Sequence, residues 1–285
     1  MEVSLLASFR RAPRVTVPCK IRLGLVAQGA ALPRNPRVPV NSSPKPPPRD
    51  GDGNHIHNEI LLSLPLKEQE LLYPKLELVR LKLHQVLHEA GDTLKSAYFC
   101  NSGMVSILSV FEDGKCVEVG LIGKEGFVGL PLVAGFRTAS TRANVQIEGS
   151  AFRVETVTLM AILRECPKLE RRLQRFSQIM ALQSTQIAAC NRLHEVNERL
   201  ARWLLMCADR VGTNSVPLTQ EFLAQMLGTR RSSVTVAAGI LQRAGLIAHA
   251  RGDTEIIDRP LLEEAACECY GIMQRQTKSW QADPE

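Results

Sequence analysis

The sequence predicts an α+β protein with three parts: an N-terminal β-roll (a jelly-roll-like barrel), a long dimerisation helix and a C-terminal winged helix-turn-helix. Short segments with a period of two, separated by glycines, recur from Leu78 onward within residues 58–165 and predict the roll. Residues 167–210 contain no glycine and, after Pro167, no proline, which favours one long helix. Residues 211–275 have the pattern of a compact helical module.

Residues 1–54 differ in composition from the rest. They hold nine of the 16 prolines, and their nine Lys or Arg against three acidic residues account for the whole net charge of +6. Such a segment buries too little apolar surface to offset its ordering entropy, so we expect a disordered, basic, proline-rich tail. An organelle transit peptide, a dispensable extension and a misplaced translation start are its alternative interpretations.

The overall composition is that of a soluble globular protein, with 45% hydrophobic and 22% charged residues. The longest apolar run without charge, Gly126 to Phe136, is too short to cross a bilayer, so no membrane association is expected. The eight cysteines form no CxxC pair, which favours reduced, buried thiols in a cytoplasmic protein. His55 and His57 lack a third ligand nearby, and no metal or cofactor is expected.

The region from Asn58 opens with a helical pattern and changes to strands at Leu78. Between two of these strands, Glu112-Asp113-Gly114-Lys115 supplies the Asp-Gly step that a tight hairpin requires. A roll of this size either holds a small ligand or encloses only a packed core. The expected strands are 79–83, 98–100, 105–111, 117–121, 142–147 and 151–155.

An apolar stripe runs along the predicted helix over 167–210 at steps of three and four. Its members are Leu169, Leu173, Phe176, Met180 and Ile187. This stripe belongs either to an amphipathic helix packed on its own domain or to a dimer axis. The change from strands before the helix to a helical module after it indicates a connector, and we therefore assign the stripe to the dimer seam.

The most specific pattern lies between Pro217 and Leu241. Thr219 can cap a first helix that contains the small residue Ala224, and Gly228 four residues later permits a left-handed turn. Thr229 is expected to cap a second helix whose buried face includes Val234 and Ile240. This spacing is typical of a helix-turn-helix. The two apolar segments 246–247 and 256–257, which flank a turn at 251–253, then predict a two-stranded wing.

Arg230 and Arg231 occupy the first turn of that second helix, where a positive charge opposes the helix dipole at a cost of some tenths of a kcal/mol, roughly 0.3–1. The same position suits DNA, because the N-terminal end of such a helix enters the major groove and arginine can bond guanine O6 and N7 together. Two solvated surface arginines are the alternative. The candidate DNA-binding residues are Thr219, Thr229, Arg230, Arg231, Ser232, Ser233, Thr235 and, as a phosphate contact in the wing, Arg251.

A roll, a connecting helix and a winged helix-turn-helix in this order resemble the CRP/FNR family of bacterial transcription regulators over residues 58–275. The resemblance rests on Gly91, Gly103, Gly114 and Gly129 in the roll and on 218–221, Ala224, Gly228, Arg231, Val234 and Leu241 in the DNA-binding module. It implies a cyclic-nucleotide-binding-like effector domain at 58–165, paired helices at 167–210, a DNA-binding domain at 211–275 and a flexible tail at 276–285. Only Arg231 matches the family's Arg-Glu-x-x-x-Arg reading motif.

The effector site departs from the family pattern. Cyclic-nucleotide binders place a Glu after the glycine that corresponds to Gly129, but this chain has Leu130 there. Losing that carboxylate leaves ribose hydroxyls unpaired, at roughly 1–3 kcal/mol, so standard cAMP recognition is not expected. The weak pocket assignment comprises Gly129, Leu130, Arg137, Thr141 and Arg142, in which either arginine meets an anion or lies in a surface turn. A nucleotide sensor with a rearranged pocket is the runner-up.

The resemblance implies three partners: double-stranded DNA with a palindromic operator, a second copy of the chain, and RNA polymerase. The N-terminal cysteines that an oxygen-sensing iron-sulfur cluster needs are absent from the pattern. Cys267 and Cys269 are expected to face different sides of a C-terminal helix, which makes a poor metal site. An enzyme or sugar-binding protein on the roll is the alternative class, but only His84 and His88 lie there. We therefore expect no enzymatic activity.

Overall fold

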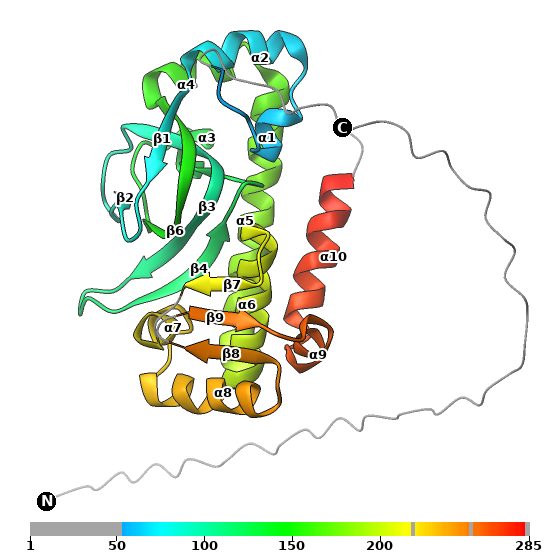
Figure 1. The fold of residues 1–285 in the computed structure, drawn as a ribbon. Helices are drawn as coiled ribbons and strands as arrows, with labels where there is room; N and C mark the ends of the chain where they lie inside the picture. The colour runs from blue at the N-terminus through cyan, green and yellow to red at the C-terminus, as the bar shows by residue number, and fades with distance from the viewer. Residues whose placement is uncertain (1–52, 218–219, 251–252, 283–285) are drawn as a thin grey trace, which may run out of the picture. The chain divides into compact units, whose positions relative to one another are not determined.

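A computed structural model describes residues 53–217, 220–250 and 253–282 (Figure 1). Within them it confirms an N-terminal sheet domain, a long helix and a C-terminal helix-turn-helix. Most of the expected tail, residues 1–52, lies outside the described residues, as do Thr219 and Arg251. None of the described helices is long and apolar enough to cross a membrane.

The N-terminal domain is built on a six-stranded antiparallel sheet in the order β1-β6-β3-β4, with β2 added against β6 and β5 against β3. The strands are β1 Glu77–Leu81, β2 Val86–His88, β3 Ser96–Val110, β4 Cys116–Ile122, β5 Phe127–Val128 and β6 Arg142–Glu155. The accompanying helices are α1 Glu59–Leu62, α2 Leu66–Leu72, the short 3-10 helix Tyr73–Lys75, α3 Leu130–Val133 and α4 Thr156–Leu163.

β3 and β6 are longer than expected, because each joins two segments that the sequence predicted as separate strands. The glycines between those segments sit where the two strands approach each other closely. A Cβ at Gly149 would lie 2.3 Å from the Ser102 carbonyl oxygen, and one at Gly103 would lie 2.5 Å from that of Ile147. Glycine therefore bends the pair here instead of ending the strands, and the register shifts around Ser102.

The single helix expected over 167–210 is two helices, α5 Pro167–Leu193 and α6 Val196–Val211. His194 and Glu195 between them have extended backbone, with ψ of 151° and 155°. The backbone N–H of Glu195 donates to the carboxylate of Glu198 at 3.0 Å, which starts the second helix. This capping contact accompanies the break between α5 and α6, and no glycine or proline in the sequence marks its position.

The assignment of the α5 stripe to an open dimer seam is wrong, because the chain buries the stripe itself. Leu169, Leu173, Phe176 and Met180 belong to the core of the sheet domain, and Ile187 is buried as well. The sheet domain makes room for the Phe176 ring by having glycine at position 126. A Cβ at Gly126 would lie 2.3 Å from Phe176 Cζ. A period of three and four marks a buried face, but it does not say what covers that face.

The C-terminal region contains α7 Gln220–Met226, α8 Arg231–Arg243, α9 Arg259–Ala265 and α10 Cys269–Ala282, with a sheet of β7 Ser215–Pro217, β9 Asp253–Ile256 and β8 Ile247–Ala250. The expected flexible tail at 276–285 is helical as far as Ala282. α10 lies along α5 (Figure 1) and buries Cys269 and Met273, and this packing orders it.

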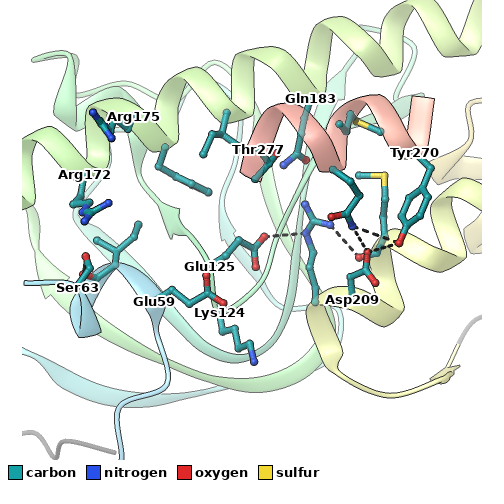
Figure 2. Close-up of a pocket in the computed structure, with 17 residues that line it drawn as sticks. Glu59, Ser63, Lys124, Glu125, Arg172, Arg175, Gln183, Asp209, Tyr270 and Thr277 are labelled. Carbon is teal, nitrogen blue, oxygen red and sulfur yellow. Dashed lines mark hydrogen bonds and ion pairs between the residues drawn. The ribbon is translucent and has the colours of Figure 1, made fainter. Parts of the chain in front are cut away.

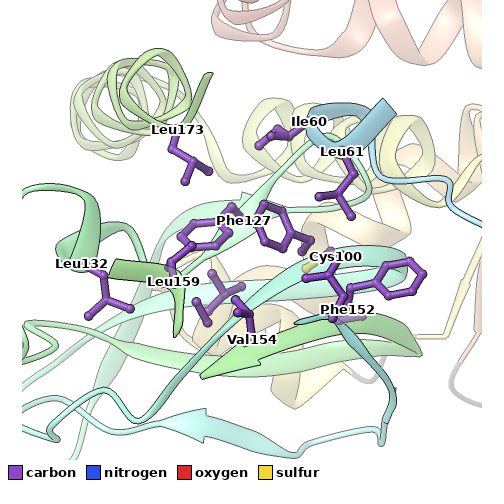
Figure 3. Close-up of a cluster of buried hydrophobic side chains, with 14 of the residues drawn as sticks. Ile60, Leu61, Cys100, Phe127, Leu132, Phe152, Val154, Leu159 and Leu173 are labelled. Atoms are coloured by element: carbon purple, nitrogen blue, oxygen red, sulfur yellow. The ribbon is translucent and has the colours of Figure 1, made fainter. Parts of the chain in front are cut away.

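Two apolar cores hold the described chain together. The first lies between the sheet, α1 and the first half of α5; Figure 3 shows Leu173 of α5 and Leu61 of α1 in the same cluster as Phe127. The second joins α6, the helix-turn-helix and α10. It also includes Met104 and Leu121 of the sheet, so the two domains share buried surface.

A buried polar contact accompanies that shared surface. Glu118 on β4 is 2% exposed and accepts hydrogen bonds from Trp203 Nε1 of α6 and Ser106 Oγ of β3, each at 2.8 Å. Burial raises the pKa of Glu118 to about 7, and these hydrogen bonds oppose the rise. The native carboxyl is therefore protonated in a pH range where the unfolded one is ionised.

Stability should accordingly fall as pH rises from about 4.5 to about 7, because the unfolded state releases the Glu118 proton first. We expect Glu118→Gln to remove up to about 3 kcal/mol of this pH dependence. Gln can still accept from Trp203. Urea unfolding at pH 5 and pH 8 measures the difference. Glu112→Gln, in the exposed hairpin, is the control and should keep the wild-type slope; equal slopes in all three proteins would contradict the assignment.

Candidate nucleic-acid interface and effector site

The turn between α7 and α8 has the geometry of a helix-turn-helix. Gly228 has φ of 57°, the left-handed conformation that its place in the sequence predicted. The N–H of Thr229 donates to the carbonyl of Ala224 at 2.9 Å and closes the turn. The two helices then pack through Leu223 and Ala224 on one side and Val234 and Leu241 on the other.

Two details of α8 differ from expectation. Arg230, not Thr229, is the N-cap residue, and no side chain caps the helix there. Ile240 is 40% exposed, and Ala237, Ala238 and Leu241 complete the buried face in its place. α8 packs against α6, and its buried face belongs to the second core, whereas Ile240 lies outside that core.

The first turn of α8 presents its polar side chains to solvent. Arg230, Arg231 and Ser232 are exposed, while Thr229 and Ser233 are half-buried. Arg231 Nε lies 4.0 Å from Glu221 Oε2, an exposed pair that holds the guanidinium only weakly. Thr235 is exposed as well, but its hydroxyl donates to Gln220 Oε1 at 2.8 Å. Arg231 is thus available for a bidentate contact with a base edge.

The expected two-stranded wing is present as β8 and β9, paired from Ile247↔Ile256 to Ala250↔Asp253. A third strand, β7, pairs with β9 and was not foreseen, because three residues carry too short a pattern to identify a strand.

A groove lies between the first turn of α8 and the β3–β4 hairpin. It has a volume of ≈ 1800 Å³, and its walls include Glu112 and Asp113 of the hairpin as well as Arg230 and Arg231. The hairpin also touches the helix-turn-helix, because Gln225 Nε2 lies 2.7 Å from Cys116 Sγ. The sheet domain therefore contacts the segment that the sequence assigns to DNA.

The residues assigned to the effector pocket are only partly suited to an anion. Gly129 has φ of 122° and precedes α3, and Leu130 packs against the first core. Arg142 Nε donates to Glu89 Oε2 at 2.6 Å, which also raises the pKa of Arg142. Arg137 is exposed and Thr141 is half-buried. The guanidinium of Arg142, one of the two arginines that could meet a phosphate, is therefore already paired with Glu89.

A pocket of ≈ 370 Å³ between α1, α5, α6 and α10 was not foreseen from the sequence (Figure 2). Arg172 and Arg175 of α5 and Lys124 contribute basic groups, and the Arg210–Glu125 ion pair of 2.9 Å lies in its wall. Burial and the nearby charge of Glu125 raise the pKa of Glu59. Its lining residues run from Glu59 to Thr277 along the chain, so no local pattern could have indicated it.

Four side chains able to bind a metal also come together. Cys190 and His194 from the end of α5 meet Cys267 and Cys269 from the start of α10, with their ligand atoms within 4.8 Å of one another. Cys190 Sγ and Cys267 Sγ share a hydrogen bond of 3.4 Å in which either thiol can be the donor, and this contact lowers the pKa of Cys190 and raises that of Cys267. The expectation for Cys267 and Cys269 failed because Cys267 precedes the helix, so the two thiols do not have helical spacing.

Comparison with known proteins matches both domains. Residues 78–166 match the cyclic nucleotide-binding domain family, and residues 198–265 match the Crp-like helix-turn-helix domain family. Together the two matched segments span more than half of the 285 residues. No curated protein matches the sequence significantly.

Solved structures with the same fold are distant in sequence. The c-di-GMP-responsive global regulator CLP of Xanthomonas campestris has 17% identity and a TM-score of 0.58 over 68% of this chain and 100% of its own. FixK2 from Bradyrhizobium japonicum has 15% identity and a TM-score of 0.59, covering 67% and 98%. A protein from Eubacterium rectale described as a crp/fnr-family regulator has 16% and 0.56, covering 73% and 98%.

The two domain matches agree with the order of the sheet domain and the helix-turn-helix in the fold. The chain is therefore a CRP/FNR-like transcription regulator that combines a cyclic nucleotide-binding domain with a Crp-like helix-turn-helix domain.

Proposed function

We propose that this regulator works as a homodimer on a palindromic operator, with Arg231 as its main base-reading residue. The observation that carries the proposal is the exposed arginine pair at the start of α8. Both charges oppose the helix dipole, and within the described part of the chain the ion pair of Arg231 is a weak, exposed contact with Glu221. A bound DNA duplex would pair both guanidinium groups with phosphates or base edges.

The dimer uses the exposed face of α5, since its apolar stripe is buried in the chain. Exposed residues recur on that face at steps of four and three, as a paired helix requires. They are Gln174, Gln178, Ala181, Thr185 and Ala188. The hydroxyl of Thr185 donates to the carbonyl of Ala181 at 2.9 Å, so it needs no partner across a seam. The small residues let two helices approach closely.

The sheet domain does not bind cAMP in the standard manner. Leu130 packs against the first core and its side chain offers no acceptor for ribose hydroxyls, while Arg142 is paired with Glu89. Binding a phosphate at Arg142 would require the carboxylate to leave a 2.6 Å contact or to accept a like charge beside it.

A regulator that responds to a small anionic effector elsewhere is the second candidate. The pocket beside α5 favours it, because ≈ 370 Å³ is within the usual range for small-molecule sites and Lys124, Arg172 and Arg175 line it.

As a transcription regulator, the protein would act in the bacterial cytoplasm and have RNA polymerase as a further partner.

Arg231→Ala should weaken binding to the cognate operator by about 1–3 kcal/mol and relax the preference at one base pair in each half-site. Selection of bound duplexes from a random pool, followed by titration, measures both effects. The half-sites should be centred about 10 base pairs apart, because a twofold dimer presents its two helices to successive major grooves. Arg243→Ala, in the last turn of the same helix, is the control and should keep the base preference. Uniform weakening on all sequences by Arg231→Ala would instead identify a phosphate contact.

Replacing Ala181 and Ala188 together by Glu should produce monomers with weak operator binding, because four like charges would meet across the paired helices. Sedimentation velocity measures the oligomeric state. Ala161→Glu, an exposed alanine on α4, is the matched control and should stay dimeric. A dimeric double variant would show that the chain pairs through another surface.

Calorimetry with cAMP and with cGMP should detect no binding in the micromolar range. The physical reason is the missing acceptor at Leu130 together with the Arg142–Glu89 pair. Saturable binding that Arg142→Ala abolishes would contradict the proposal and place a nucleotide in the sheet domain.

A further inference from the structure

The cluster of Cys190, His194, Cys267 and Cys269 has a place in the fold that the DNA-binding function does not explain. Cys190 lies in the last turn of α5, and His194, the residue that caps this helix, donates its backbone N–H to the carbonyl of Cys190 at 3.1 Å. Cys269 is the first residue of α10, which packs against α5, and Cys267 lies two residues before it. Two separate segments thus contribute two ligands each.

The distances fit a single tetrahedral ion. Zn–S bonds of about 2.3 Å and Zn–N bonds of about 2.0–2.1 Å imply edges of about 3.8 Å between two sulfurs and about 3.6 Å between sulfur and nitrogen. The structure has 3.4 Å between Cys190 Sγ and Cys267 Sγ and 3.5 Å between Cys269 Sγ and His194 Nδ1. No pair of ligand atoms is further apart than 4.8 Å. Three thiols and one imidazole are a donor set of structural zinc sites.

The surroundings suit a metal complex with a net negative charge. Three thiolates and one Zn²⁺ sum to about −1. Arg199 and Arg202 are buried in α6, and their charges act on Cys190. Among the described residues, the Nε atoms of both arginines have no hydrogen-bond partner. Gln186 Nε2 donates to Cys269 Sγ at 3.1 Å, the outer contact that orients a metal-binding thiolate.

We propose that Cys190, His194, Cys267 and Cys269 bind one zinc ion. The ion joins the end of α5 to the start of α10 and closes a loop of 77 residues that contains the whole helix-turn-helix and its wing. Arg199, beside the site, donates to the carbonyl of Leu227 in the turn before α8. The metal therefore stabilises the region around Arg199 that supports the turn before α8.

Metal analysis of the full-length protein, purified with reductant and without chelator, tests the site. We expect about one zinc per chain. Cys190→Ser, His194→Asn and Cys269→Ser should lose it. Cys166→Ser is the control: this thiol is buried at the N-cap of α5, where serine is a favourable residue, and zinc should be retained. Gln186→Ala should keep the ligands but weaken zinc affinity about 10–100-fold.

Cobalt exchange provides a test that needs no substitution. After chelation of the wild-type protein, added Co²⁺ should give the visible spectrum of tetrahedral cobalt with thiolate charge-transfer bands, and one equivalent of Zn²⁺ should abolish it. Three results would overturn the proposal: a metal-free protein in which the three thiols Cys190, Cys267 and Cys269 react freely after growth in zinc-supplemented medium, iron with inorganic sulfide, or a Cys190–Cys267 disulfide found by mass spectrometry in the reduced preparation.

Discussion

The burial of the α5 stripe against the sheet is the constraint on which the remaining architecture depends. Gly120 and Gly126 leave room for Met180 and Phe176, and a Cβ at either glycine would lie within 2.4 Å of these side chains. One face of α5 is therefore committed to the chain's own core. α10 takes a second face, which contributes to the pocket of ≈ 370 Å³ and to the cysteine cluster, and a third face of α5 is exposed among the described residues.

The contacts between the sheet domain and the DNA-binding region are specific rather than merely apolar. Trp203 of α6 donates to the buried Glu118 of β4, and Arg210 of the same helix pairs with Glu125. Further along, a Cβ at Gly228 would lie 2.9 Å from Val117. The turn that orients α8 is thus in contact with the sheet domain, so a change in the sheet has a direct physical path to the reading residues.

Features set by a few neighbouring residues could be predicted from the sequence. The Asp-Gly hairpin, the left-handed Gly228 and the paired wing strands all follow from local backbone preferences. What failed depends on partners distant in the chain. The stripe of α5 was recognised as apolar, but its pattern could not say that the chain's own sheet covers it. The helix break at His194 depends on a capping carboxylate in a segment that otherwise has strong helical character.

The return of α10 to α5 also determines how the DNA-reading unit can move. A domain at the end of a single connection can swing freely about that connection. Here the unit is anchored twice, through α6 at its beginning and through α9 and α10 at its end. Any reorientation of the unit must move both connections together or break one of them. The unit can therefore rotate about an axis through both connections, but it cannot swing freely in all directions. The stability of the contact between α10 and α5 then determines whether both connections move together or the one through α9 and α10 is released.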